Sequence, residues 1–299
     1  MKWGWVALAV LADVCVYFWH AIRWRVLLLP VVKFSFFDTA RSIYVGLLVN
    51  EIIPLRAGEL VRCYILSRNP ALPLSVALSS ALIERVFDGI WLCLCLVAVL
   101  HYMPLPPGFN YVVDGGYALA TAVVLVAAAL SFALFRGSTT KWPLGQVTPN
   151  ESHWRRSLRV LLADLQIIGH SRSLLASFFQ SLPYLLLQTL PIYFSMRGYG
   201  FDLSLSTAFA LMVILRLGSV LPQAPGNIGI FQFVTREVLV KMFNVVPDEA
   251  ARFSLVLWGI VTMPLLIGGL IALSTTGLQF RKLHSDAQSE AAGLSQSKS

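Results

Sequence analysis

Long apolar runs with few polar positions dominate the chain, and five of them are long enough to cross a membrane. An apolar helix of about 20 residues spans the roughly 30 Å hydrocarbon core of a bilayer. The first run ends at Arg23-Trp24-Arg25, which we expect to be an interfacial anchor, and its start lacks the features of a cleaved signal peptide. The five predicted spans are Trp3–Ile22, Val86–Met103, Tyr117–Phe135, Leu174–Phe194 and Phe253–Leu273.

Two further apolar segments are shorter or interrupted by polar residues. Residues 40–53 form a stretch of only 14 residues that contains Arg41, Asn50 and Glu51, and residues 205–221 contain Arg216. Short apolar stretches of this kind are typical of re-entrant segments, which need protein or a water-filled cavity to satisfy their backbone. The pattern therefore predicts helical hairpins over 40–66 and 205–243, turning at Pro54–Gly58 and Pro222–Gly229. In the alternative, each hairpin is a pair of full crossings and the chain has eight or nine spans.

The two hairpin segments also resemble each other in sequence. When residues 39–58 are aligned with 207–226, Thr39-Ala40 matches Thr207-Ala208, Pro54 matches Pro222 and Gly58 matches Gly226. Interrupted hydrophobic segments at corresponding places in two halves of a membrane protein indicate a transport site. We therefore predict an internal repeat whose two breaks meet near the bilayer midplane.

Composition supports a single membrane domain and excludes a soluble class. The chain has 299 residues, of which 57% are hydrophobic and 13% charged, and its mean hydropathy is +0.72. Soluble domains carry about 25% charged residues. We expect one transmembrane domain over 1–280 and a disordered cytoplasmic tail over 281–299. The net charge of +8 indicates basic loops at the cytoplasmic face rather than nucleic-acid binding.

The distribution of Lys and Arg predicts the topology. Basic residues concentrate in 23–41, 136–172 and 281–282, whereas 104–116 has none and 196–204 has only Arg197. With five spans and two re-entrant hairpins, every basic-rich loop lies on the cytoplasmic side. The N-terminus is then outside and the C-terminus cytoplasmic. The hairpins enter from opposite sides, so the repeat is inverted.

This topology has a direct test with an impermeant thiol reagent on intact cells. In a background without the native Cys15, Cys63, Cys93 and Cys95, a cysteine replacing Asp114 should be labelled. A cysteine replacing Ser138 should be labelled only after the cells are opened. Equal labelling at both positions in intact cells would contradict the predicted orientation.

Charged and polar residues in and beside the apolar segments are the candidate binding residues. After the first break, a helix starting near Gly58 directs its backbone N–H groups toward an anion, and Arg provides a fork suited to phosphate. Acids nearby balance the arginines. Each cluster also has a purely structural interpretation. The charges of 50–62 would be loop side chains that reach the membrane interface, those of 84–88 would flank a span, and 222–232 would be a turn between two spans. The candidates are Asn50, Arg56, Glu59, Arg62, Glu84, Arg85, Asp88, Arg216, Asn227 and Gln232, with hinges at Pro54, Gly58, Pro222, Pro225, Gly226 and Gly229.

Signatures of catalysis and of cofactor binding are missing from the sequence. It has no Gly-x-Ser-x-Gly, no phosphate-cradling Gly-x-x-x-x-Gly-Lys and no His-Glu-x-x-His. The Cys93-x-Cys95 pair has no His or acid beside it and is more typical of packing than of a metal site. We expect no enzyme activity, no cofactor and no metal, although Glu84 or Asp88 has the chemistry of a general base.

Three of these motifs, in this order, resemble one known family. Asn50-x-x-x-Pro54-x-Arg56-x-Gly58-Glu59-x-x-Arg62, Glu84-Arg85-x-x-Asp88 and Pro225-Gly226-Asn227-x-Gly229 are similar to the lysylphosphatidylglycerol synthase transmembrane domain family, also called flippase-like proteins. Arg23-Trp24-Arg25 resembles that family's early motif. The resemblance implies lipid flipping. Two-part members add an aminoacyltransferase domain, which is not found here, so we do not expect this chain to make aminoacylated lipid.

The chain departs from the family pattern at the second break. Asn227 in Gly226-Asn227-Ile228-Gly229 replaces a common Gly, and Gln232 stands where relatives often carry Glu. If that acid couples transport in relatives, the coupling here differs.

The expected function is movement of an anionic or zwitterionic phospholipid or glycolipid between the leaflets of the cytoplasmic (inner) membrane. Arg56 and Arg62 would hold the phosphate, and Glu59, Glu84 and Asp88 would balance them. The alternative is a membrane-embedded enzyme or accessory subunit of glycolipid or isoprenoid-lipid synthesis. Expected partners are the lipid substrate and an enzyme of lipid synthesis.

Overall fold

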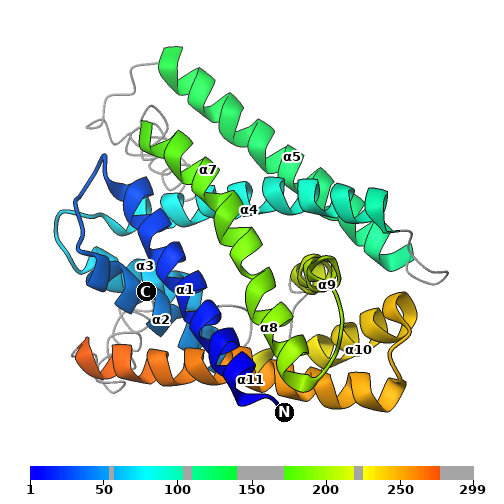
Figure 1. Ribbon diagram of the computed structural model, residues 1–299. Helices are drawn as coiled ribbons and strands as arrows, with labels where there is room; N and C mark the ends of the chain where they lie inside the picture. Colours follow the sequence, from blue (N-terminus) through cyan, green and yellow to red (C-terminus); the bar gives the residue numbers. More distant parts are fainter. Residues whose placement is uncertain (54–56, 104–109, 140–171, 219–224, 277–299) are drawn as a thin grey trace, which may run out of the picture.

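The computed structural model describes residues 1–53, 57–103, 110–139, 172–218 and 225–276, and all of its regular elements are helices (Figure 1). The first half contains α1 (Trp3–Leu28), α2 (Phe36–Ile52), α3 (Gly58–Ser67), α4 (Leu74–Tyr102) and α5 (Asn110–Thr139). The second half contains α7 (Arg172–Leu187), α8 (Thr189–Tyr199), α9 (Leu205–Gly218), the 3₁₀ turn η2 (Pro225–Asn227), α10 (Ile230–Phe243) and α11 (Pro247–Thr275). The predicted all-helical class is confirmed for these residues, whereas the predicted tail 281–299 lies outside them.

Each of the five predicted spans corresponds to a long helix or helix pair. Two of the helices extend well beyond the predicted bounds, since α4 begins at Leu74 rather than Val86 and α5 begins at Asn110 rather than Tyr117. The predicted run Leu174–Phe194 is divided between α7 and α8, which continue one another along α1 (Figure 1). The division lies at Gln188 because Pro191, three residues on, has no N–H to donate to the carbonyl of Leu187.

Hydropathy and length single out two membrane-crossing helices within the described residues, α1 and α11. The number of full spans therefore stays a prediction. The distribution of side chains supports a lipid environment, because large apolar residues face outward and charged residues lie inside. Outward-facing examples are Leu94, Val97, Leu255, Ile267 and Ile271, whereas Arg23, Arg62 and Glu84 are buried.

The predicted hairpins correspond to two pairs of short helices. With 10 residues in α3 and 14 each in α9 and α10, these helices are about 15 to 21 Å long and too short to cross a bilayer alone. Helix α3 packs tightly on α2, since a β-carbon added to Gly58 would lie 1.8 Å from the carbonyl oxygen of Gly46. Helices α9 and α10 likewise contact each other. The re-entrant arrangement and the inverted repeat remain predictions.

Candidate functional site

A cavity of about 190 Å³ lies between the end of α2 and the second break, at η2. It is bounded by α1, by the end of α2, by the α7–α8 junction and by α9, η2, α10 and α11. Charged and polar residues mix with apolar ones along its wall. The polar lining residues are Asp13, Tyr17, Glu51, Gln188, Arg216, Asn227 and Thr262, with Trp258 beside them.

The end of α2 and the second break are in direct contact at this cavity. The Asn227 side-chain amide donates a hydrogen bond to Oε1 of Glu51 over 3.2 Å, although the two residues are 176 positions apart. At η2 the backbone is left-handed at Gly226 (φ +71°) and Asn227 (φ +55°). Gly and Asn adopt this conformation most easily. Trp258 of α11 donates to the Gly226 carbonyl at 2.7 Å. The end of α2 therefore contacts η2, the described part of the second break, whereas residues 54–56 of the first break lie outside the described residues.

Both signs of charge face this cavity. Arg216 comes from the last turn of α9 and donates a hydrogen bond to the Gln188 side chain at the α7–α8 junction. Asp13 comes from the middle of α1 and Glu51 from the end of α2. Asp13 is 5% exposed, and its Oδ2 atom has no hydrogen-bond partner among the described residues. The cavity can therefore bind an anion at its guanidinium and a cation or proton at its carboxylates.

The contact between the end of α2 and η2 can be tested by crosslinking. Cysteines replacing Glu51 and Asn227, in a background without native cysteines, should be joined within one chain by a short bifunctional thiol reagent, because the native side chains are in hydrogen-bond contact. Gel mobility before and after reduction measures the product. Each single-cysteine variant is the control. A double variant that behaves like the single ones would contradict this contact.

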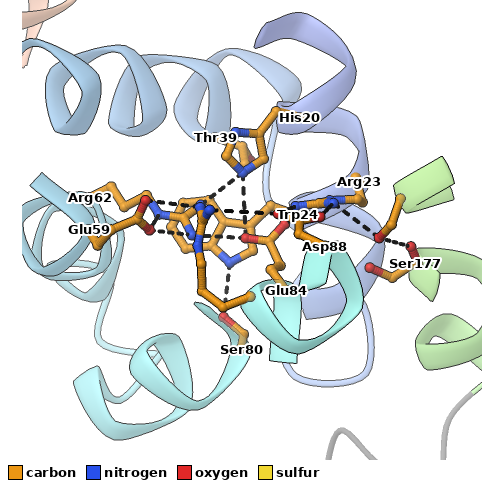
Figure 2. A network of polar contacts seen from close by, with 12 residues as sticks. His20, Arg23, Trp24, Thr39, Glu59, Arg62, Ser80, Glu84, Asp88 and Ser177 are labelled. Carbon is orange, nitrogen blue, oxygen red and sulfur yellow. Dashed lines mark hydrogen bonds and ion pairs between the residues drawn. The ribbon is translucent and has the colours of Figure 1, made fainter. Parts of the chain in front are cut away.

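A second group of charged residues forms a largely buried network that joins α1, α3, α4 and α7 (Figure 2). At its centre, Glu84 of α4 accepts a hydrogen bond from Nε of Arg23 at 3.1 Å and another from Arg62 of α3 at 2.9 Å. Arg23 and Glu84 have no solvent exposure and Arg62 has 2%. Arg23 also pairs with Asp88 and donates to Ser181 of α7.

The network continues to the edge of α3 and α4. Glu59 accepts hydrogen bonds from Arg62 and from Arg85, each at 2.9 Å. The network thus contains three arginines and three acids, which balance one another. Aromatic rings cover the two buried guanidinium groups, with Trp24 against Arg62 and Tyr184 against Arg23, each 4.5 Å from the ring centre.

This arrangement changes the interpretation of the first motif. The prediction that Arg23-Trp24-Arg25 is an interfacial anchor is wrong for Arg23 and Trp24, because both are fully buried, and only Arg25 is exposed. Arg62 and Glu84 are hydrogen-bonded to each other, and they also bond Glu59 and Arg23, respectively. The network fastens α1, α3, α4 and α7 together, which is a structural role that the charges can fill with or without a ligand.

The remaining candidates divide between the cavity and the hairpin turns. Arg216 and Asn227 line the cavity. The Asn50 side chain accepts a hydrogen bond from the Gly58 N–H at 2.8 Å, and Gln232 accepts one from the Gly229 N–H at 2.7 Å. Each therefore ties a turn to its helix. Pro225 and Gly226 form η2, whereas Pro54, Arg56 and Pro222 lie outside the described residues. Lipid binding by any of these residues stays a prediction.

Sequence reasoning did not select Asp13, Tyr17, Glu51 or Gln188. A signal for Asp13 was available, because an ionisable residue inside a predicted span is rare and marks function. The same signal applies to Glu51, an ionisable residue in the apolar segment 40–53. Tyr17 and Gln188 give no such signal, since their place at the cavity depends on how separate helices pack. Among the described residues, no group of three His, Cys, Asp or Glu side chains could hold a metal ion.

Comparison with known families identifies the class of protein. The model of the lysylphosphatidylglycerol synthase transmembrane region matches residues 1–269. The chain therefore belongs to this family of membrane proteins, which is associated with lipid metabolism or transport. Comparisons with curated proteins and with solved structures found no match.

Proposed function

We propose that the protein moves a phospholipid or glycolipid with an anionic or zwitterionic head group between the leaflets of the inner membrane, without changing it chemically. The observation that carries the proposal is the cavity between the end of α2 and η2, with Asp13, Glu51 and Arg216 on its wall. Irregular backbone and ionisable side chains inside a membrane domain mark substrate pathways.

The size of the cavity supports binding of a head group alone. Pockets that enclose a whole drug-sized ligand measure about 300–1,000 Å³, and this cavity measures about 190 Å³. The acyl chains would remain in the hydrocarbon while the head group crosses. Arg216 would hold the phosphate through its planar fork, and the helix that begins at Ile230 directs its positive end toward the same region.

Reconstitution into vesicles tests this proposal. Purified protein is inserted into vesicles that contain a fluorescent phospholipid, and an impermeant reductant is added outside. In protein-free vesicles only the outer-leaflet label is quenched, whereas the proposal expects complete quenching with the protein present. Chromatography of the same lipid separates transport from chemistry. A chemically altered lipid that stays in its leaflet would favour the membrane enzyme instead.

A further inference from the structure

Asp13 has an environment that the transport proposal does not yet use. It lies on the buried face of α1, on the cavity wall, with 5% exposure, and in the described part of the chain Oδ2 has no hydrogen-bond partner. Isolated ionised carboxylates are costly to bury, so they are neutralised by a proton or by a partner. The cavity offers Arg216, which is close enough to interact with Asp13 electrostatically.

We infer that Asp13 is a proton-binding site that competes with the lipid phosphate for Arg216, so that the head group and one proton enter the cavity together. The inference rests on the proposed function and names the ion that accompanies the lipid. Ionised Asp13 attracts the guanidinium and repels a phosphate. Protonated Asp13 does neither, and it can donate a hydrogen bond to a phosphate oxygen.

The charges around Asp13 support one proton for each lipid. The charged side chains on the described cavity wall are two carboxylates and one guanidinium, a net charge of −1 when all are ionised. A phosphate of charge −1 would bring the cavity to −2, and uptake of one proton restores −1. The described cavity faces of α8, η2, α10 and α11 carry no titratable group. The other titratable groups near Asp13 are Tyr17 on α1, Glu51 and Tyr44 on α2, Tyr184 on α7 and Arg216 on α9.

Asp13 is a better proton acceptor than Glu51 for a geometric reason. Glu51 receives a hydrogen bond from the Asn227 amide, and such a bond favours the ionised carboxylate. Among the described residues, Oδ2 of Asp13 receives no hydrogen bond. A proton on Asp13 would satisfy this oxygen without competing with a described hydrogen bond.

Calorimetry of binding tests the inference without transport. Dihexanoyl phosphatidylglycerol is titrated into the detergent-solubilised protein in two sodium-free buffers of different ionisation enthalpy. The apparent binding enthalpies should differ by the amount for uptake of about one proton per lipid. Asp13→Asn, which resembles the protonated form, should bind the lipid without proton uptake. Asp202→Asn is the matched control, since the Asp202 side chain is 92% exposed and outside the cavity.

The outcomes separate this inference from the proposed function. Lipid binding without proton uptake in the wild type, equal uptake in Asp13→Asn, or no binding at all would each overturn the inference. Asp13→Glu restores a titratable group and should restore uptake, which distinguishes chemistry from misfolding. If binding takes up a proton but reconstituted vesicles show no lipid movement, the proton site stands and the transport function fails. If the vesicles show lipid movement but Asp13→Asn keeps the wild-type pH dependence of the transport rate, the transport function stands and the proton site fails.

Discussion

Arg23→Ala should prevent the protein from accumulating in a folded form. The guanidinium has no solvent exposure and bonds Glu84, Asp88 and Ser181 on two other helices. Removal of Arg23 leaves the three acids of the network with only Arg62 and Arg85 to balance them, and breaking a buried pair costs about 3–5 kcal/mol. That is a large share of the 5–15 kcal/mol by which typical proteins are stable. The amount of monodisperse protein extracted in mild detergent, together with its melting temperature, measures the effect.

Arg25→Ala provides a control on the same helix. Arg25 carries the same charge two residues away, but its side chain is exposed. Its removal should leave yield and melting temperature nearly unchanged, within the roughly 0.5 kcal/mol typical of surface substitutions. Equal loss of protein in the two variants would indicate that basic residues at this end of α1 act through insertion and orientation rather than through the buried network.

Arg216→Ala should nearly stop lipid movement while the protein remains folded. The cavity is where the proposal places the phosphate, and Arg216 is the guanidinium on its described wall. Loss of hydrogen bonds to a charged group costs about 1.5–3 kcal/mol each, which corresponds to a decrease of roughly tenfold to more than a hundredfold in the transport rate. The quenching rate in reconstituted vesicles measures it, at matched amounts of folded protein.

Two further variants sharpen this test. Arg216→Lys keeps the charge but loses the planar fork, so its rate should fall between those of the wild type and Arg216→Ala. Arg252→Ala removes a guanidinium whose side chain is 72% exposed, and its rate should equal that of the wild type. If folded Arg216→Ala transports lipid at the wild-type rate, Arg216 does not bind the phosphate. Arg56, which the sequence also places at a break, would then be the next candidate.

The sequence alone determined the all-helical class, the family, and the glycines at the start of α3 and at η2. These features are local, because the length of an apolar run and the backbone freedom at Pro and Gly depend on neighbouring residues alone. They include the five apolar runs, the two short apolar segments and the Pro and Gly residues that interrupt them. The break at Gly226 and the start of α3 at Gly58 follow directly from them. The motif residues also indicated the protein family, and the family match over residues 1–269 confirms it.

Only the tertiary structure decided which charges belong to which site. Arg62, Glu84 and Asp88 look like ligand residues in the sequence, but in the fold they neutralise one another and Arg23, 61 positions before Glu84. Asp13 and Glu51 instead share the cavity with Arg216. Helical periodicity shows which residues share a face of one helix, but not which helix packs against that face. Ion pairs and cavities form between helices, so their membership depends on packing that no local pattern contains.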